Sequence, residues 1–178
     1  MAAYVAGDRS AFNELFARYS TLVTRVAARG LYDQSAVPDL VQRTFLQLHR
    51  ARNDFKPGSP LRPWLMTIAM NVKRQHLRSV GRRREDALEL DGRTDPVAAP
   101  HDAAQTQRAR KLHQALASLP ETTREVIELH WLEGLSFAEV ATVVGASLSA
   151  VKVRAHRGYS KLRAQLVSQG VTVAEFEG

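Results

Sequence analysis

The sequence predicts an all-α protein made of two small helical domains joined by a flexible linker. Its periodic segments repeat their apolar residues at three- and four-residue spacing, and no stretch alternates with period two or carries a hairpin signal. Residues 87–109, "ALELDGRTDPVAAPHDAAQTQRA", have the proline, glycine and small-residue composition of a linker. The 178 residues, 44% of them hydrophobic, suffice for a core on either side. We therefore expect domains at 1–86 and 110–170 and a tail at 171–178.

The first domain is expected to contain three helices. Asp8 or Ser10 can cap the first, whose apolar residues run from Phe12 to Val26 at helical spacing. The second begins near Pro38, because proline is favoured in the first turn of a helix. The third follows the turn sequence "DFKPGSP".

The second helix presents one apolar and one polar face. At 100° per residue, the apolar face holds Leu40, Val41, Thr44, Phe45, Leu48 and Ala51. The opposite face holds Asp39, Gln42, Arg43, Leu46, His49 and Arg50. Leu46 thus lies among polar residues, where it is either a contact for another protein or an ordinary exposed leucine.

The third helix is apolar on most of its circumference and leaves one polar stripe. The stripe consists of Thr67, Asn71, Arg74 and Arg78, with Trp64 at its border, and Arg82, Arg83 and Arg84 follow. Met66, Met70 and Leu77 form a second apolar flank together with Lys73. The stripe is either a solvated face or a surface that follows a phosphate backbone and offers an aromatic ring and an amide to bases.

The second domain carries a helix-turn-helix pattern. One helix is expected from Pro120 to Gly134, and Ser136 with Glu139 makes a capping box for "FAEVATVV", which ends at Gly145. Ser147 or Ser149 can cap the next helix. Counted from Phe137, the fifth, ninth and fifteenth residues are Ala141, Gly145 and Val151. These positions need a small residue, a left-handed turn and an apolar anchor, respectively.

The last helix is strongly basic outside one narrow apolar arc. The arc is Val151, Ala155, Gly158 and Leu162, and no Asp or Glu occurs between Glu139 and Glu175. Because ordinary solvated helices mix both signs of charge, this helix is expected to bind an external anion. In a helix-turn-helix such a helix enters the DNA major groove. The expected base readers are Lys152, Val153, His156 and Arg157, and the expected phosphate contacts are Arg154, Lys161 and Arg163.

Composition favours a nucleic-acid partner and offers no enzyme site. The formal charge is +7 and the isoelectric point is near 10.2, which favours polyanionic partners. There is no cysteine, no signal-peptide pattern and no run of about 18 apolar residues, so we expect a cytoplasmic protein. The six histidines form no metal-binding spacing. We therefore expect no catalytic residue, metal, cofactor or small-molecule substrate.

Four segments, in order, resemble the extracytoplasmic function (ECF) group of the sigma-70 family of RNA polymerase sigma factors. "GDRSAFNELFARY" is similar to the family's opening helix and "VPDLVQRTFLQLHRA" to its polymerase-clamp-binding segment. "FKPGSPLRPWLMTIAMNVKRQHLR" resembles the promoter minus 10 segment. The segment from "LPETTREVIELHW" to "VKVRAHRGYSKLR" resembles the minus 35 domain. The resemblance implies a transcription initiation factor built from sigma region 2 and sigma region 4.

The resemblance also implies partners and site residues. The partners are core RNA polymerase, through its β′ clamp and β flap, promoter DNA, and an anti-sigma factor. Asp39, Gln42, Arg43 and Leu46 match the clamp-binding segment, and Asn71, with the loop before Trp64, matches the part that captures a flipped minus 10 base. Lys152, Val153, His156 and Arg157 match the minus 35 readers. Arg43 and Gln75 depart from the family pattern, which commonly has acidic residues there. The alternative is a homodimeric helix-turn-helix regulator that acts on duplex DNA.

Overall fold

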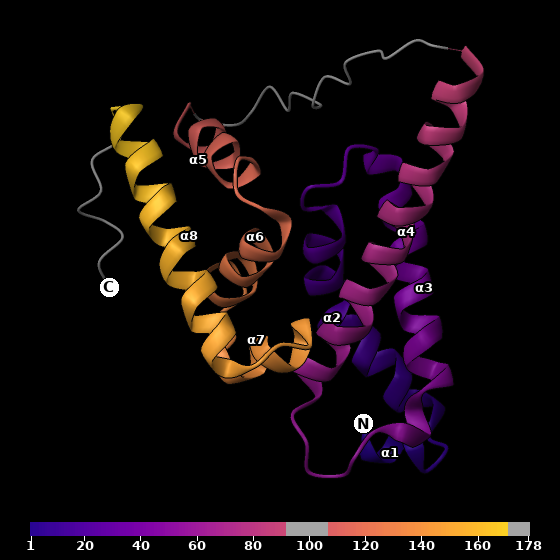
Figure 1. Cartoon of the computed structure of the whole chain (residues 1–178). Coiled ribbons are helices and arrows are strands. Elements are labelled where there is room, and N and C mark those ends of the chain that lie inside the picture. The colour runs from indigo at the N-terminus through magenta and orange to yellow at the C-terminus, as the bar shows by residue number, and fades with distance from the viewer. Residues whose placement is uncertain (92–106, 171–178) are drawn as a thin grey trace. The chain divides into compact units, whose positions relative to one another are not determined.

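The computed structural model describes the backbone of residues 1–91 and 107–170 and the side chains of 1–82 and 111–170. These residues form helices and turns without any strand, and the chain divides into two compact units, Met1–Pro100 and His101–Gly178 (Figure 1). The expected all-α class with two helical domains is confirmed. Most of the expected linker, residues 92–106, and the expected tail, residues 171–178, lie outside the described residues.

Residues 1–91 of the first unit form a bundle of three long helices with a short one at its N-terminus. The helices are α1 (Ala2–Val5), α2 (Arg9–Ala28), α3 (Val37–Arg50) and α4 (Leu61–Asp91). Single 3₁₀ turns lie between α2 and α3, at Gln34–Ala36, and between α3 and α4, at Arg52–Asp54. α2, α3 and α4 pack against one another in all three pairs. Their core includes the fully buried Val23, Leu40, Leu65 and Val72, which the helical periodicity had placed on the inner faces.

Asp8 caps α2. Its carboxylate accepts hydrogen bonds from the hydroxyl and the backbone N–H of Ser10, at 2.7 and 2.8 Å. These bonds stabilise the charged form, so the hydrogen bond from the Ser10 side chain, followed by that from its backbone, lowers the pKa of Asp8 below its ordinary value of 3.8. Of the two residues proposed as caps, Asp8 is the capping residue and Ser10 is its donor.

We expect this cap to make the first unit sensitive to acid. Because the pKa of Asp8 is lower in the folded state, its contribution is fully present above the unfolded pKa and is lost as pH falls through the folded pKa. Asp8→Asn keeps a good cap that does not titrate. Thermal unfolding followed by circular dichroism between about pH 5 and pH 2 should show a smaller loss of stability for Asp8→Asn than for the natural chain. Parallel curves for the two proteins would contradict this.

Lys73 lies in the apolar flank of α4, where a backbone carbonyl accepts a hydrogen bond from its ammonium group. Its side chain is buried, and its Nζ donates to the carbonyl of Val26 in the last turn of α2 at 3.2 Å. The last carbonyls of a helix lack intrahelical donors and carry partial negative charge. Lys73 therefore ties α4 to the C-terminal end of α2, while its neighbours Met66 and Met70 are fully packed.

α4 is longer than the linker composition predicted. It continues to Asp91, so residues 87–91, which the linker composition had included in 87–109, are helical. The sequence "EDALEL" before that point contains good helix formers, and the first helix-breaking residue is Gly92. Composition averaged over the whole segment hid this local preference.

Within residues 107–170, the second unit has four helices and one π-helical turn. They are α5 (Gln107–Ala117), α6 (Glu121–Ile127), the π-helical turn Glu128–Leu132, α7 (Phe137–Val144) and α8 (Leu148–Ser168). The helix expected from Pro120 to Gly134 thus widens at Glu128 and is not uniform. One core cluster of this unit is formed by residues of α5, α6 and α8 together with Leu119: Ala115, Leu116, Leu119, Ile127, Leu162 and Leu166.

The turn between α7 and α8 has the geometry that the helix-turn-helix spacing predicts. Ser136 and Glu139 form the complete capping box at the start of α7. Gly145 ends the helix with a φ of 65°, a left-handed conformation that glycine adopts without strain. Ser147, and not Ser149, caps α8 by accepting a hydrogen bond from the N–H of Ala150.

Gly158 lets α8 lie close against α6. A Cβ at this position would be 2.8 Å from Thr123 Cγ2 and 3.0 Å from Ile127 Cγ1. Both distances are below ordinary van der Waals contact. With Val151, Ala155 and Leu162, which are also buried, Gly158 forms the inner face of α8 that the sequence analysis predicted.

Candidate nucleic-acid and protein interfaces

The outer face of α3 carries the four residues proposed to contact polymerase. Asp39, Gln42 and Leu46 are exposed and Arg43 is half-buried; Leu46 exposes 45% of its surface. Arg43 Nη1 lies 3.5 Å from Asp39 Oδ2, one helical turn apart. An acidic residue at position 43 would instead repel Asp39. The departure from the family pattern at Arg43 thus creates an ion pair on this face.

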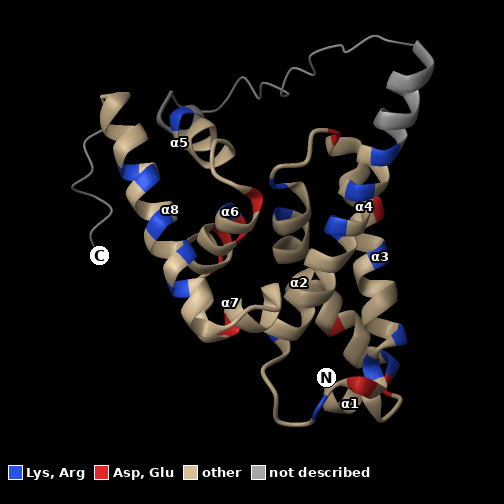
Figure 2. Ribbon diagram, viewed as in Figure 1, with Lys and Arg blue, Asp and Glu red and all other residues tan. Residues whose placement is uncertain are grey.

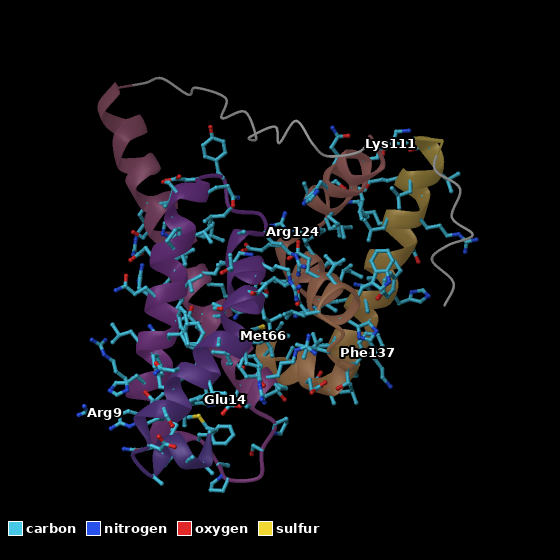
Figure 3. The ribbon with its side chains drawn as sticks, turned by 180° about the vertical axis from the view of Figure 1, so that it is seen from behind. Arg9, Glu14, Met66, Lys111, Arg124 and Phe137 are labelled. Atoms are coloured by element: carbon cyan, nitrogen blue, oxygen red, sulfur yellow. The ribbon has the colours of Figure 1, made fainter. Side chains whose placement is uncertain are left out.

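Leu46 lies on the rim of an apolar groove that the sequence pattern did not predict. The groove has a volume of about 940 Å³ and is lined by residues of α1, α2 and α3: Tyr4, Arg9, Phe12, Asn13, Phe16, Thr24, Val37, Pro38, Val41, Gln42, Phe45, Leu46 and His49. Arg9 projects from the N-terminal end of α2 (Figure 3). None of the lining residues is acidic, so the groove combines an apolar floor with a cationic margin.

Aromatic rings form the floor and one end of this groove. Phe16, on α2, is 44% exposed and its ring centroid lies 4.7 Å from that of the buried Phe45, on α3. Tyr4 of α1 packs on Phe12, and its hydroxyl is hydrogen-bonded to Nδ1 of His49; burial raises the pKa of Tyr4. In the sequence, the i, i+4 pair Phe12 and Phe16 is the one indication of this aromatic floor. Helical spacing alone could not show that Phe16 stays exposed.

The polar stripe of α4 is present as predicted, although its members differ in exposure. Asn71 and Arg78 are exposed, whereas Thr67 and Arg74 are half-buried. The Thr67 hydroxyl donates to the Pro63 carbonyl at 3.0 Å, and Arg74 Nη1 donates to Asn71 Oδ1 at 3.4 Å. This last bond orients the Asn71 amide and leaves its NH₂ group as the donor available for a base.

Trp64 at the border of the stripe is held by a second ring. Its centroid lies 5.2 Å from that of Phe55 in an edge-to-face arrangement, a favoured geometry for aromatic pairs. Phe55 belongs to the loop that precedes α4. The indole is half-buried, so the loop and the helix together present one partly exposed aromatic surface. Asn71 lies on the same face of α4, about two helical turns away.

The outer face of α8 is basic from Lys152 to Arg163. Figure 2 shows Lys and Arg on it and no Asp or Glu. All four expected base readers are exposed: Lys152, Val153, His156 and Arg157. Of the expected phosphate contacts, Arg154 is half-buried, and Lys161 donates through Nζ to the Ser118 carbonyl at 3.2 Å. A phosphate contact by Lys161 would have to replace that bond.

The described residues offer neither a metal centre nor a membrane-spanning segment. Among the described side chains, 1–82 and 111–170, no three His, Asp or Glu residues are grouped closely enough to hold a metal ion. No helix among the described residues has the length and apolarity required to cross a bilayer. The exposed features that call for a function are therefore the groove, the α4 stripe and the outer face of α8.

Family models and relatives of known family match this chain over most of its length. Residues 15–83 match the family model of sigma-70 region 2, and residues 109–162 match that of sigma-70 region 4. The chain is 40% identical over 168 residues to the RNA polymerase sigma factor CarQ of Myxococcus xanthus, covering 94% of this chain and 96% of that protein. It is 32% identical over 161 residues to the ECF RNA polymerase sigma-E factor of Escherichia coli K12, covering 85% of this chain and 84% of that protein.

A solved structure of a similar protein includes a protein partner. The sigma factor RpoE of Bartonella quintana, in complex with the anti-sigma factor NepR, superimposes with a TM-score of 0.74 at 26% identity. The match covers 87% of this chain and 96% of that one. The similarity therefore extends over both helical units.

Proposed function

The chain belongs to the ECF group of the sigma-70 family, and from this we propose a role in transcription initiation for each of its exposed surfaces. It is an alternative sigma factor, which binds core RNA polymerase and directs it to specific promoters. The family consists of transcription regulators, and we infer that this member catalyses no reaction itself. We place it in the cytoplasm with the polymerase.

The first unit is proposed to hold polymerase and to open the promoter. Asp39, Gln42, Arg43 and Leu46 on the outer face of α3 contact the β′ clamp. Trp64, Thr67, Asn71, Arg74 and Arg78 contact the minus 10 strand. A base that leaves the stack and is bound in a protein pocket stabilises the open duplex, so strand opening follows from binding alone. The exposed Asn71, on the same face of α4 as Trp64 and about two helical turns away, is the observation that supports this role.

The second unit is proposed to read the minus 35 element and to contact the β flap. The exposed Lys152, Val153, His156 and Arg157 on the first turns of α8 contact base edges, and Arg154 and Lys161 lie closer to the phosphates. The two units are thus proposed to bind different elements of one promoter. Because both units belong to one chain, binding by one raises the effective concentration of the other.

An anti-sigma factor is the third partner that we propose. The similar RpoE structure contains one, and ECF factors as a group are commonly held inactive by such proteins. In this chain the apolar groove beside Leu46 provides an exposed surface of the kind that protein partners cover.

Run-off transcription with purified core polymerase tests the assignment. The chain should stimulate initiation at defined start sites on a promoter library, whereas core polymerase alone should not. The alternative, a homodimeric regulator, requires tight and specific binding of the free protein to palindromic duplex DNA. That result, together with a failure to stimulate initiation, would overturn the assignment.

Arg157→Ala is expected to weaken recognition of the minus 35 element. A bidentate contact to a guanine discriminates by about 1 to 3 kcal/mol, and Arg157 is exposed on the reading face. Holoenzyme affinity for promoters with an intact and a scrambled minus 35 element should differ less for the variant than for the natural chain. Equal discrimination by both proteins would rule out a base contact by Arg157.

A further inference from the structure

A valine occupies the centre of the exposed face of α8. Successive residues turn by about 100° around a helix, and the buried Val151, Ala155, Gly158 and Leu162 mark the side that faces the core. Within the first two turns of α8, the residues that point most directly away from this side are Ser149 and Val153; Ser160, Ala164 and Val167 do so further along the helix. In those first turns Val153 is the apolar one, and it exposes 48% of its surface.

Cationic and polar side chains flank Val153 on both sides. His156 and Arg157 lie about 50° to either side of the outward direction, and Lys152 lies about 90° from it, on the same side as His156. All three are exposed. On the exposed face of this helix, positive charge is therefore concentrated at the flanks, whereas the outermost position in the second turn is apolar.

Packing inside the protein does not account for a valine at this position. Val153 is absent from the buried core of the unit, and valine is a poorer helix former than Ala, Leu or Lys. Valine is also rigid about χ1, so it presents its two methyl groups in a defined direction. A comparable exposed valine, Val167, lies at the other end of α8 and is 56% exposed, and it offers a matched control.

We propose that Val153 is a specificity-determining residue that contacts the C5-methyl group of a thymine in the minus 35 element. This inference rests on the proposed minus 35 role of α8. The N-terminal turns of a recognition helix reach the base edges of the major groove. The thymine methyl is the apolar group of base pairs in that groove, and apolar side chains recognise it. The charged neighbours of Val153 suit phosphates and polar base edges instead.

Substitution of single thymines by deoxyuridine tests the contact, because it removes the methyl and preserves base pairing. A promoter is first selected from a library with holoenzyme. Each thymine of its minus 35 element, on either strand, is then replaced by deoxyuridine, and holoenzyme affinity is measured. For the natural chain we expect one position at which affinity falls roughly fourfold, the factor that corresponds to one buried methyl group. Val153→Ala should lose sensitivity at that position, and Val167→Ala should keep it.

The possible outcomes separate this inference from the proposed function. If holoenzyme selects a minus 35 sequence but no deoxyuridine position matters, or if Val153→Ala retains the sensitivity, the thymine contact is wrong and the function stands. A selected element without any A·T pair would also overturn the contact. If holoenzyme selects no minus 35 sequence, both the minus 35 role and the contact fail. Val153→Thr, which keeps one methyl and the β-branched shape, should retain part of the sensitivity and excludes misfolding as the cause.

Discussion

Replacing Leu46 by aspartate is expected to abolish stable association with core RNA polymerase while the protein remains folded. Leu46 is 45% exposed on the rim of the apolar groove, so its loss removes little from the core. At an interface, truncation of a central apolar residue costs about 2 to 4 kcal/mol, which corresponds to roughly 30- to 1,000-fold in affinity. A carboxylate adds the cost of desolvating a charge. Run-off transcription should fall accordingly.

Three measurements test whether Leu46 contacts polymerase directly. Circular dichroism of Leu46→Asp should match that of the natural chain, and a loss of helicity would show that the side chain supports the fold. Leu46→Met should retain binding, because it conserves volume and apolarity. Val167→Asp introduces the same charge at an exposed valine of the second unit and should leave polymerase binding unchanged. If Leu46→Asp binds as well as Val167→Asp, the outer face of α3 is not the polymerase contact.

Gly158→Val is expected to destabilise the second unit by roughly 3 kcal/mol, the upper part of the range for overpacked cores. The first added carbon would meet Thr123 Cγ2 at 2.8 Å and Ile127 Cγ1 at 3.0 Å. Neither neighbour yields easily, since Thr123 is β-branched and Ile127 is fully buried. α8 must therefore move away from α6, and the recognition helix loses its support.

Denaturant unfolding followed by tryptophan fluorescence measures this effect. The second unit contains one tryptophan, Trp131, whose ring lies edge-on to Tyr159 of α8, so a Trp64→Phe background reports on that unit alone. The matched control is Gly81→Val in α4, where an added Cβ would meet nothing within 4 Å. Adding Thr123→Ser, which removes the nearest carbon, should restore part of the stability of Gly158→Val. Equal unfolding midpoints for Gly158→Val and the natural chain would show that the contact relaxes without cost.

Local rules predicted the turn of the second unit and both faces of α3. The capping box at Ser136 and the left-handed Gly145 depend on residues at most a few positions apart, and such interactions are visible in sequence. The exposure of Leu46 follows from helical periodicity in the same way. The roles of these residues at polymerase and DNA remain predictions, because they depend on partners.

The groove and the π-helical turn could not be predicted from the same rules. The exposed side of Phe16 depends on where α1 and α3 pack against α2, and periodicity contains no information about tertiary neighbours. The short helix α1 has four residues, too few to produce a periodic signal. At Glu128–Leu132 the π-helical turn shifts the register of the following residues, which a fixed angle of 100° per residue does not represent.

α4 extends to Asp91. The direction in which the chain leaves this helix therefore depends on how far the helix has rotated at its last residue. Five helical residues advance the chain by about 7.5 Å, whereas an extended segment of that length would span about 17 Å. Deleting one of residues 87–91 would shorten the path by only about 1.5 Å but would rotate the exit of the chain by about 100°. Insertions of about seven residues, two full turns, would nearly restore the original direction. The direction in which α4 releases the chain therefore depends on helical phase as well as on the number of helical residues.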